Sequence, residues 1–207
     1  MYVWVRRCPA GELLLEAGAL LLGEERSRLR VEREAGGRPW VARGNERLAV
    51  SVSHSYDAAG EIVAVAASPG GLVGIDIEPL RPVPVLGLAR RWFRADEVDW
   101  LVAQDNQAEA FLLLWTAKEA VGKALGTGLR GAGLRRAVPL PEGDLSVLRP
   151  VPTATDLAVS YMSVHGFVLA VAVFGQSAPR IEIVAHDTAA LSTSRSRTSL
   201  PVVVRGN

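Results

Sequence analysis

Two acidic residues at alternate positions stand out in the segment Gly74–Glu78 (GIDIE). If this segment is a strand, Asp76 and Glu78 lie on one of its faces and the two isoleucines on the other. Two neighbouring carboxylates repel each other unless a cation lies between them. Solvated acids on an exposed strand are the commoner explanation, but this strand runs into a proline-rich loop, where functional sites tend to lie. The pair is therefore a candidate cation-binding site.

The only two lysines of the chain, Lys118 and Lys123, lie in the segment Trp115–Lys123 (WTAKEAVGK). Glu119 and Lys123 are four residues apart and share a face of the predicted helix, whereas Lys118 projects about 100° away from Glu119. A surface salt bridge is the ordinary interpretation of the Glu119–Lys123 pair. Gly122 is harder to explain, because glycine inside a helix costs about 1 kcal/mol relative to alanine. A neighbour or ligand that approaches the backbone closely would account for it.

Together the two segments supply the groups for phosphoryl-type transfer. Asp76, Glu78 and Glu119 offer three hard oxygen ligands, which suit Mg²⁺, and magnesium binds through carboxylates together with substrate phosphates. Lys123 is placed one turn from Glu119, where its compact ammonium group can reach a phosphate oxygen. A metal ion and a lysine would neutralise the charge that develops during transfer. These residues therefore predict a magnesium site beside a phosphate-binding lysine.

The apolar pattern predicts the elements that position these residues. Strands are expected at Leu48–Ser53, Glu61–Ala67, Leu72–Glu78, Asp144–Leu148, Asp156–Ser163 and Gly166–Phe174. Helices are expected at Leu13–Leu22, Leu86–Phe93, Asp96–Val102 and Ala108–Leu125. The segment Glu24–Glu34 fits either an exposed helix end or an edge strand.

A faint internal repeat suggests two related halves. Leu48–Ser51 (LAVS) reappears as Leu157–Ser160, and the apolar strand Ile62–Ala66 (IVAVA) has a counterpart in Val168–Ala172 (VLAVA). Chance similarity of alanine- and valine-rich strands is the alternative. We expect an α+β fold in which each half packs a helix on a small antiparallel sheet. The expected divisions are residues 1–80, residues 81–176 with the long helix, and a disordered tail at 177–207.

The composition narrows the class of protein. The chain has 207 residues, of which 49% are hydrophobic and 22% charged, and its formal net charge is +1. This content supports a buried core, and the neutral charge gives no support for nucleic-acid binding. The single cysteine, Cys8, fits a reducing compartment, and no apolar run reaches the roughly 20 residues that cross a bilayer. We therefore expect a cytoplasmic monomer that binds neither nucleic acid nor membrane.

In order and spacing, Gly74–Glu78 and Trp115–Lys123 resemble the paired signature of the 4′-phosphopantetheinyl transferases, and Ala124–Leu129 (ALGTGL) continues the likeness. The resemblance runs from about Leu13 to Phe174 and is greatest to the surfactin-synthetase-activating type, a pseudo-dimer of two similar α+β halves. Such enzymes transfer the phosphopantetheine arm of coenzyme A to a serine of an acyl or peptidyl carrier protein and release adenosine 3′,5′-bisphosphate. The resemblance implies an Mg²⁺-dependent enzyme and favours carriers of polyketide or nonribosomal-peptide synthesis, that is, of secondary metabolite biosynthesis.

The resemblance also implies roles for individual acidic and basic residues. Asp76, Glu78 and Glu119 would hold Mg²⁺ and the coenzyme A pyrophosphate, and Lys123 would contact that pyrophosphate and stabilise the leaving group. Glu97 matches a glutamate that lies near the metal in the family. Either Glu97 or Glu119 would then act as general base for the incoming serine.

The coenzyme A phosphates would be held by residues of the first half. Ser53 and His54 belong to a Ser-His-Ser segment that resembles the family's phosphate-contacting motif, with His54 donating to the 3′-phosphate. Arg38 lies in a Gly-Arg-Pro segment that matches one beside the adenine and the 3′-phosphate, and its planar fork suits a phosphate. Arg6 and Arg7 are the candidates for the basic residues that the family carries near its N-terminus.

One departure from the family favours an alternative. Family members usually carry several dozen more residues before the helix equivalent to Leu13–Leu22, so the first half is expected to be truncated. This favours a catalytically impaired relative that binds coenzyme A or a carrier protein without turnover, whereas the intact acidic residues and Lys123 favour the enzyme. An unrelated metal-dependent phosphoesterase would share the carboxylates but would leave Trp115–Lys123 unexplained. Lys118 is expected to pair with substrate or with another acid.

Recognition of the carrier is expected to depend on arginine. Carrier proteins are generally acidic, so a basic edge would complement them. Scattered, solvated arginines are the alternative interpretation. The candidates are Arg90, Arg91, Arg94, Arg130, Arg135 and Arg136.

Overall fold

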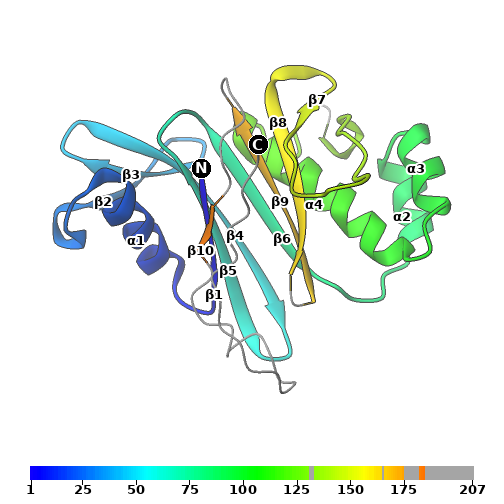
Figure 1. The fold of residues 1–207 in the computed structure, drawn as a ribbon, viewed down its shortest axis with the longest axis horizontal. Helices are drawn as coiled ribbons and strands as arrows, with labels where there is room; N and C mark the ends of the chain where they lie inside the picture. The colour runs from blue at the N-terminus through cyan, green and yellow to red at the C-terminus, as the bar shows by residue number, and fades with distance from the viewer. Residues whose placement is uncertain (131–132, 165, 175–181, 185–207) are drawn as a thin grey trace.

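Two sheets lie face to face between helices in the computed structural model, which describes residues 1–130, 133–164, 166–174 and 182–184 (Figure 1). Helix α1 (Ala10–Leu22) covers the outer face of the first sheet. Helices α2 (Val85–Trp92), α3 (Ala95–Val102) and α4 (Gln107–Leu125) lie on the outer side of the second. The fold is therefore α+β, as predicted, and the four helices expected from the sequence are confirmed to within three residues at each end.

Each sheet is antiparallel, apart from one terminal pair. The first sheet has the order β10 (Glu182–Val184), β1 (Tyr2–Arg6), β5 (Gly60–Ser68), β4 (Glu46–Asp57), β3 (Pro39–Arg43) and β2 (Arg30–Arg33), and only β10 and β1 run parallel. The second sheet has the order β6 (Val73–Pro79), β9 (Phe167–Phe174), β8 (Ala154–Val164) and β7 (Arg149–Val151). Two short 3-10 turns, η1 (Arg26–Arg28) and η2 (Gly133–Arg135), complete the described elements.

Three apolar clusters separate the layers, and strand alternation assigns side chains to them. In β6, Ile75 and Ile77 enter the cluster between the two sheets. The intervening residues, Gly74 and Asp76, therefore face the other side of the strand, toward α4. This alternation is the local reason that Asp76 lies against a helix and not between the sheets.

Strand β6 pairs across the boundary that the sequence predicts at residue 80. It lies before that boundary, and it pairs with β9 along its whole length, from Val73↔Val173 to Pro79↔Phe167. The strand therefore belongs to the second sheet, and the change of sheet occurs in the turn between β5 and β6. Backbone pairing with residues that lie 88 to 100 positions further along the chain decides this, and no local sequence pattern indicates it.

Other boundaries also differ from expectation. The segment Asp144–Leu148 is a turn, because the backbone amide and hydroxyl of Ser146 both donate to Asp144 Oδ1, and strand β7 begins only after it. Strands β1 and β3 were not predicted. In the expected tail, Glu182–Val184 forms β10, and the rest of 177–207 lies outside the described residues. Among the described helices, none is long and apolar enough to cross a membrane.

The internal repeat falls on corresponding hairpins. Leu48–Ser51 lies on β4 and Leu157–Ser160 on β8, and each strand pairs with the next one along the chain, β5 or β9. In each sheet a helix packs on the outer face of that hairpin. The two copies thus occupy equivalent places in the two layers.

Candidate functional site

Strand β6 and helix α4 meet at unusually short range, and this contact brings the two predicted motifs together. A Cβ atom at Gly74 would lie 1.9 Å from the carbonyl oxygen of Ala120 and 2.6 Å from the backbone nitrogen of Ala124. Only a residue without a side chain allows the backbones to approach this closely. Asp76 on β6 is thereby set opposite Lys123 on α4, as the hydrogen bond between them shows.

Asp76 is the centre of the polar contacts at this junction. Its Oδ1 atom accepts a hydrogen bond from Ser53 Oγ of β4 at 2.8 Å and one from Lys123 Nζ at 2.8 Å. Lys123 Nζ also donates to the backbone carbonyl of Ile75 at 2.9 Å. The second oxygen, Oδ2, is buried and has no hydrogen-bond partner among the described atoms. The Oδ2 oxygen of this buried carboxylate is therefore available to contact a ligand.

The acidic residues of the two motifs act on one another electrostatically. Burial raises the pKa of Glu78 above its usual value, and the charge of Asp76 raises it further. Burial also raises the pKa of Glu119, again with a second contribution from Asp76, while Lys123 opposes the shift. Three carboxylates that repel one another in this way form a negatively charged site. A bound cation would reduce that repulsion.

The carboxylate oxygens of Asp76, Glu78 and Glu119 are the type of ligand atom that a hard cation prefers. As the side chains stand, no group of three acidic, histidine or cysteine residues in the described chain is arranged closely enough to bind a metal ion. Asp76 Oδ2 nevertheless lacks a partner, and two further half-buried carboxylates stand within its electrostatic reach. Carboxylate oxygens with room for water are the ligands that Mg²⁺ prefers. Asp76, Glu78 and Glu119 are therefore the residues that could hold such an ion.

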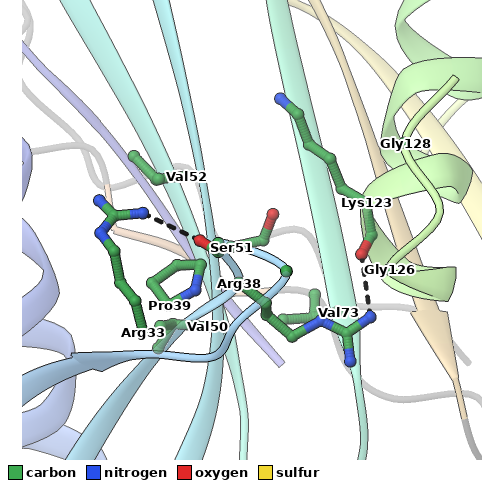
Figure 2. A pocket seen from close by; sticks show the side chains of 12 residues that line it. Arg33, Arg38, Pro39, Val50, Ser51, Val52, Val73, Lys123, Gly126 and Gly128 are labelled. Carbon is green, nitrogen blue, oxygen red and sulfur yellow. Dashed lines mark hydrogen bonds between the residues drawn. The ribbon is translucent and has the colours of Figure 1, made fainter.

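A cavity of about 260 Å³ lies beside this group (Figure 2). It is bounded by the turn before β3, the middle of β4 and the C-terminal end of α4, and Arg33, Arg38 and Lys123 line it. Figure 2 shows Arg38 reaching across to α4, where its Nη2 atom donates to the carbonyls of Ala124 at 2.9 Å and Lys123 at 3.3 Å. Three cationic side chains around one cavity suit an anionic ligand.

The structure does not bring the other expected phosphate contacts to this cavity. His54 lies on the opposite face of β4 from Ser53, is exposed, and has its Nδ1 atom 2.9 Å from Glu61 Oε1. Arg6 makes two hydrogen bonds of 2.8 Å with Glu16, and Arg7 binds Asp57 at 2.5 Å. Strand alternation explains His54, because neighbouring residues point to opposite faces. The hydroxyl of Ser53 donates its hydrogen bond to the carboxylate of Asp76 in this structure.

Glu97 is placed differently from the expectation that it lies near the metal. It is 1% exposed, and Lys118 Nζ donates to its two oxygens at 2.6 and 2.7 Å. Its Oε2 atom also accepts from the backbone amide of Arg94 at 2.9 Å, which caps the first turn of α3. Both oxygens are therefore committed, and Glu97 is not among the charges that act on Glu119. Of the two candidate bases, Glu119 is the one whose carboxylate has no hydrogen bond or ion pair with another residue in the described part of the chain.

The close neighbour expected at Gly122 is confirmed, because a Cβ atom there would lie 2.3 Å from the carbonyl oxygen of Gly128. Arg136 differs from expectation. It was expected on an exposed basic edge, but it is 7% exposed, and its Nη2 atom donates to Thr127 Oγ1 at 3.1 Å. The remaining arginines of that edge are exposed. No feature of the local sequence distinguishes Arg136 from its exposed neighbour Arg135.

The contact from Ser53 to Asp76 leads to a first prediction. Replacing Ser53 with alanine removes the hydroxyl that fixes Oδ1 across the two sheets, and we expect divalent-cation affinity to fall about threefold to tenfold, since a hydrogen bond to a charged group contributes about 1 kcal/mol or more. Isothermal titration with Mn²⁺ measures this. Ser160→Ala is the matched control, because Ser160 is fully buried and its hydroxyl has no partner among the described atoms. Equal Mn²⁺ affinity in the two variants would remove Ser53 from the site.

Comparison with known proteins shows what the segment around this junction is similar to. Residues 72–172 match a family model described as the 4′-phosphopantetheinyl transferase superfamily. This segment contains β6, α4 and the acidic residues Asp76, Glu78, Glu97 and Glu119.

Three relatives are similar to the chain. A protein named putative 4′-phosphopantetheinyl transferase from Synechocystis sp. is 37% identical over 109 residues, which is 51% of this chain and 42% of the relative. A 4′-phosphopantetheinyl transferase from Aneurinibacillus migulanus is 34% identical over 95 residues, 45% of this chain and 36% of the relative. The 4′-phosphopantetheinyl transferase HetI from Nostoc sp. is 32% identical over 131 residues, 60% of this chain and 53% of the relative. The chain thus matches about half or less of the length of each, and its segment 72–172 is similar to the 4′-phosphopantetheinyl transferase superfamily.

Proposed function

We propose that this protein transfers the 4′-phosphopantetheine group of coenzyme A to a serine of an acyl or peptidyl carrier protein and releases adenosine 3′,5′-bisphosphate. The observation that carries the proposal is the junction of β6 and α4, where Asp76, Glu78 and Glu119 meet Lys123 at the wall of a cavity lined by cations. This junction lies inside the segment that matches the superfamily.

The finer assignments are part of the same proposal. The likeness to the Aneurinibacillus migulanus protein supports the surfactin-synthetase-activating type, and the equivalent hairpins of the two sheets support a pseudo-dimer of two halves. The protein would act as a cytoplasmic monomer. Its partner would be an acidic carrier domain that meets the exposed arginines of the second half. A second cavity of about 370 Å³, lined in part by Arg90, Phe93 and Arg135, offers charge and apolar surface together for such a partner.

Magnesium held by Asp76, Glu78 and Glu119 would neutralise the charge of the coenzyme A pyrophosphate. The residues of the chain supply the remaining steps. Lys123 leaves Asp76 Oδ1 and donates to a phosphate oxygen, a movement that its flexible stem and its 30% exposed side chain permit. Glu119 accepts the proton of the serine hydroxyl, because its carboxylate is free whereas that of Glu97 is not. Arg33 and Arg38 add positive charge where the nucleotide phosphates would lie.

One observation favours a second candidate, a relative that binds coenzyme A or the carrier without turnover. Arg6, Arg7 and His54 each contact an acid and do not line the cavity, so these three residues do not add to its positive charge. The two candidates differ in product. Chromatographic detection of adenosine 3′,5′-bisphosphate, formed only when coenzyme A, Mg²⁺ and an apo carrier protein are all present, supports the transferase. Tight coenzyme A binding without that product would establish the second candidate.

The contact between Lys123 and Asp76 predicts that one substitution strengthens the binding of Mn²⁺ alone and weakens the binding of Mn²⁺ with pyrophosphate. Lys123→Met removes the ammonium that competes with a cation for Asp76, so we expect Mn²⁺ alone to bind about tenfold more tightly. The same variant lacks the phosphate contact, so Mn²⁺ with inorganic pyrophosphate should bind more weakly than to the unaltered protein. Calorimetric titration of both ligands measures the two effects. Arg47→Met, an exposed change on β4 that also removes one positive charge, controls for net charge, and a matching rise in its Mn²⁺ affinity would refute the competition.

A further inference from the structure

The side chain of Arg38 joins the turn between β2 and β3 to the C-terminal end of α4 (Figure 2). Its Nη2 atom donates to the backbone carbonyls of Ala124 at 2.9 Å and Lys123 at 3.3 Å. The guanidinium also lies against Gly126, where a Cβ atom would be 2.5 Å from Nη2 and 3.2 Å from Cζ. The last turn of α4 and the residue that follows it therefore both contact this half-buried side chain.

These contacts supply donors that the end of a helix lacks. The last carbonyls of an α-helix have no intrahelical partner. The backbone amides of residues 126–128 donate to the carbonyls of Gly122 and Lys123, whereas the carbonyl of Ala124 accepts from Arg38. A cation at this end of a helix also interacts favourably with the helix dipole. Arg38 therefore caps α4 from a part of the chain that lies 86 positions away in sequence.

The turn itself fixes the backbone of Arg38. Its carbonyl accepts from the amide of Glu34 at 3.0 Å, and the amide of Gly37 donates to the carbonyl of Glu34 at 2.8 Å. Gly37 has a φ of 85°, which favours glycine, and Pro39 restricts the residue before it to extended conformations. The side chain of Arg38 therefore reaches α4 from a well-defined backbone position.

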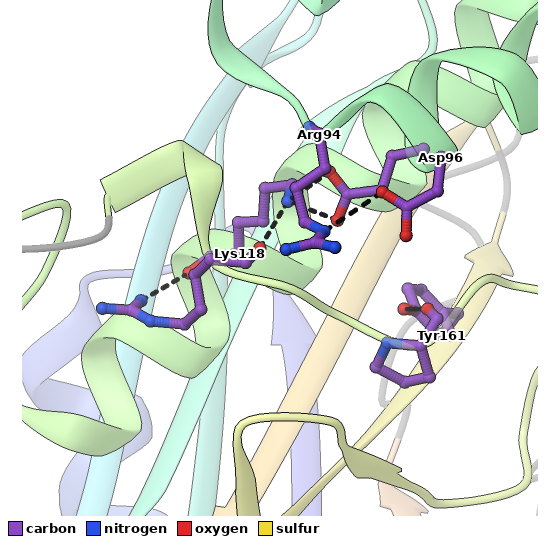
Figure 3. Close-up of polar contacts among 7 residues, drawn as sticks. Arg94, Asp96, Lys118 and Tyr161 are labelled. Atoms are coloured by element: carbon purple, nitrogen blue, oxygen red, sulfur yellow. Dashed lines mark hydrogen bonds and ion pairs between the residues drawn. The ribbon is translucent and has the colours of Figure 1, made fainter.

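The middle of α4 is held in a different way, within the second layer (Figure 3). Lys118 is fully buried, and its ammonium donates to both oxygens of Glu97 and, at 2.6 Å, to the backbone carbonyl of Arg136. These contacts lie nearly two turns before the carbonyl that Arg38 caps. Removal of the Arg38 guanidinium should therefore loosen the last turn of α4 and leave the middle of the helix in place.

The two segments that Arg38 joins are walls of the same cavity. The turn before β3 supplies Gly37 and Pro39, and the end of α4 supplies Lys123 and Gly126. Lys123 is thus presented to the cavity from the turn of helix that Arg38 caps. Movement of this turn would change both the width of the cavity and the position of the Lys123 ammonium.

We propose that Arg38 is a positioning residue, which holds the last turn of α4 against the turn before β3 and so places Lys123 at the cavity. The consequence for coenzyme A rests on the proposed function, whereas the contact itself concerns only this chain. The sequence predicts another role for Arg38, a direct contact with the 3′-phosphate. Its Nε and Nη1 atoms have no hydrogen-bond partner among the described residues, so the two roles have to be separated by experiment.

Amide hydrogen exchange without ligand gives the first readout for the variant Arg38→Met. Methionine keeps an unbranched stem but cannot donate to the carbonyls of α4. We expect the amides of residues 126–128 to exchange about fivefold to tenfold faster, because the capping contact from a charged group is lost. Protection of the amides around Lys118 should not change. Equal protection of residues 126–128 in the variant and the unaltered protein would overturn the positioning role.

Arg43→Met is the matched control. Arg43 is also half-buried, and its Nη1 atom donates to the carbonyl of Leu22, the last residue of α1. The variant therefore removes the same kind of helix cap at a place that does not line the cavity. We expect faster exchange of the amides of Gly23 and Glu24, which both donate into the last turn of α1, and no change at residues 126–128. Equally fast exchange of residues 126–128 in both variants would indicate general destabilisation and would refute the proposal.

Calorimetric titration with coenzyme A and with 3′-dephospho-coenzyme A, both with Mg²⁺ present, separates positioning from a phosphate contact. If Arg38 acts through α4, Arg38→Met weakens the binding of both ligands by the same factor, about fivefold. Arg43→Met should leave both affinities within about twofold of those of the unaltered protein. A loss for coenzyme A that exceeds the loss for the dephospho compound by about threefold or more would show that Arg38 contacts the 3′-phosphate, against the proposal.

A double-mutant cycle with Lys123→Met tests whether Arg38 acts through Lys123. Residues that act in one network show non-additive effects. We therefore expect Arg38→Met to weaken coenzyme A binding by less than about twofold once Lys123 has been replaced. A further loss of about fivefold in the Lys123→Met protein would mean that Arg38 makes its own contact with the ligand, and the positioning of Lys123 would be wrong.

The outcomes separate this inference from the proposed function. If the unaltered protein binds no coenzyme A but Arg38→Met still speeds exchange at residues 126–128, the proposed function fails and the holding of α4 by Arg38 is supported. If phosphopantetheine transfer occurs and exchange at residues 126–128 is the same in Arg38→Met, the function stands and the positioning role fails.

Discussion

Glu119→Gln is expected to reduce phosphopantetheine transfer by about 10³-fold or more while leaving the fold intact. The substitution keeps the shape of the side chain and removes both its charge and its capacity to accept a proton. Burial and the charge of Asp76 already raise the pKa of Glu119, so a neutral amide relieves repulsion at the site. Tm should therefore be unchanged or slightly higher. Transfer kinetics and thermal unfolding of the same preparation measure both effects.

Glu109→Gln provides the matched control for that variant. Glu109 lies in the first turn of the same helix, where it interacts with Asn106 at the helix cap and is remote from the Asp76 contacts. Its replacement should leave transfer within about twofold of the unaltered protein. Full activity in Glu119→Gln would remove Glu119 from both the cation site and the proton transfer. The base would then have to be sought among other acids.

Gly74→Ala should destabilise the protein more than alanine at any other described glycine, because its Cβ would make the shortest contact. The new Cβ would lie 1.9 Å from the carbonyl oxygen of Ala120, and both atoms are attached to backbone, so neither β6 nor α4 can yield by a side-chain rotation. Overpacking of a well-packed core costs about 1–3 kcal/mol, and a clash between two backbones should reach about 3 kcal/mol or more. Chemical denaturation gives the free energy of unfolding.

The control is Gly70→Ala in the turn before β6. A Cβ atom at Gly70 meets no atom within 4 Å, and the backbone there does not require glycine. Its free energy of unfolding should change by less than about 0.5 kcal/mol. Equal stability of the two variants would mean that β6 does not press on α4, and the juxtaposition of Asp76 with Lys123 would lose its structural basis.

Local periodicity predicted the parts of the site that depend on one element. Alternation in β6 placed Asp76 and Glu78 on one face, and the helical spacing of α4 placed Glu119 and Lys123 on one face. The structure adds that these faces meet, with Lys123 bound to Asp76. That contact depends on β6 joining the second sheet, which is decided by pairing with a distant strand and has no local signature.

Of the two partners expected for Lys118, substrate or another acid, the structure shows an acid, but neither its identity as Glu97 nor the burial of the pair could be predicted. Lysine and glutamate are usually exposed, so a fully buried pair contradicts the ordinary expectation for both side chains. Arg136 shows the same difficulty, because it follows an exposed arginine in an apparently uniform basic segment. Strand β1 was missed for a different reason, since its five residues end in arginine and show no turn signal before them. In each case tertiary contact overrides the local pattern.

The intact mass of an apo carrier protein tests the central claim most directly. The carrier is incubated with this protein, coenzyme A and Mg²⁺, beside reactions that lack Mg²⁺, contain the Glu119→Gln variant, or contain a carrier whose acceptor serine is alanine. The account predicts that the carrier gains the mass of one phosphopantetheine group in the complete reaction alone. An unchanged mass for carriers of fatty-acid, polyketide and nonribosomal-peptide synthesis, with a folded protein that binds coenzyme A, would contradict it.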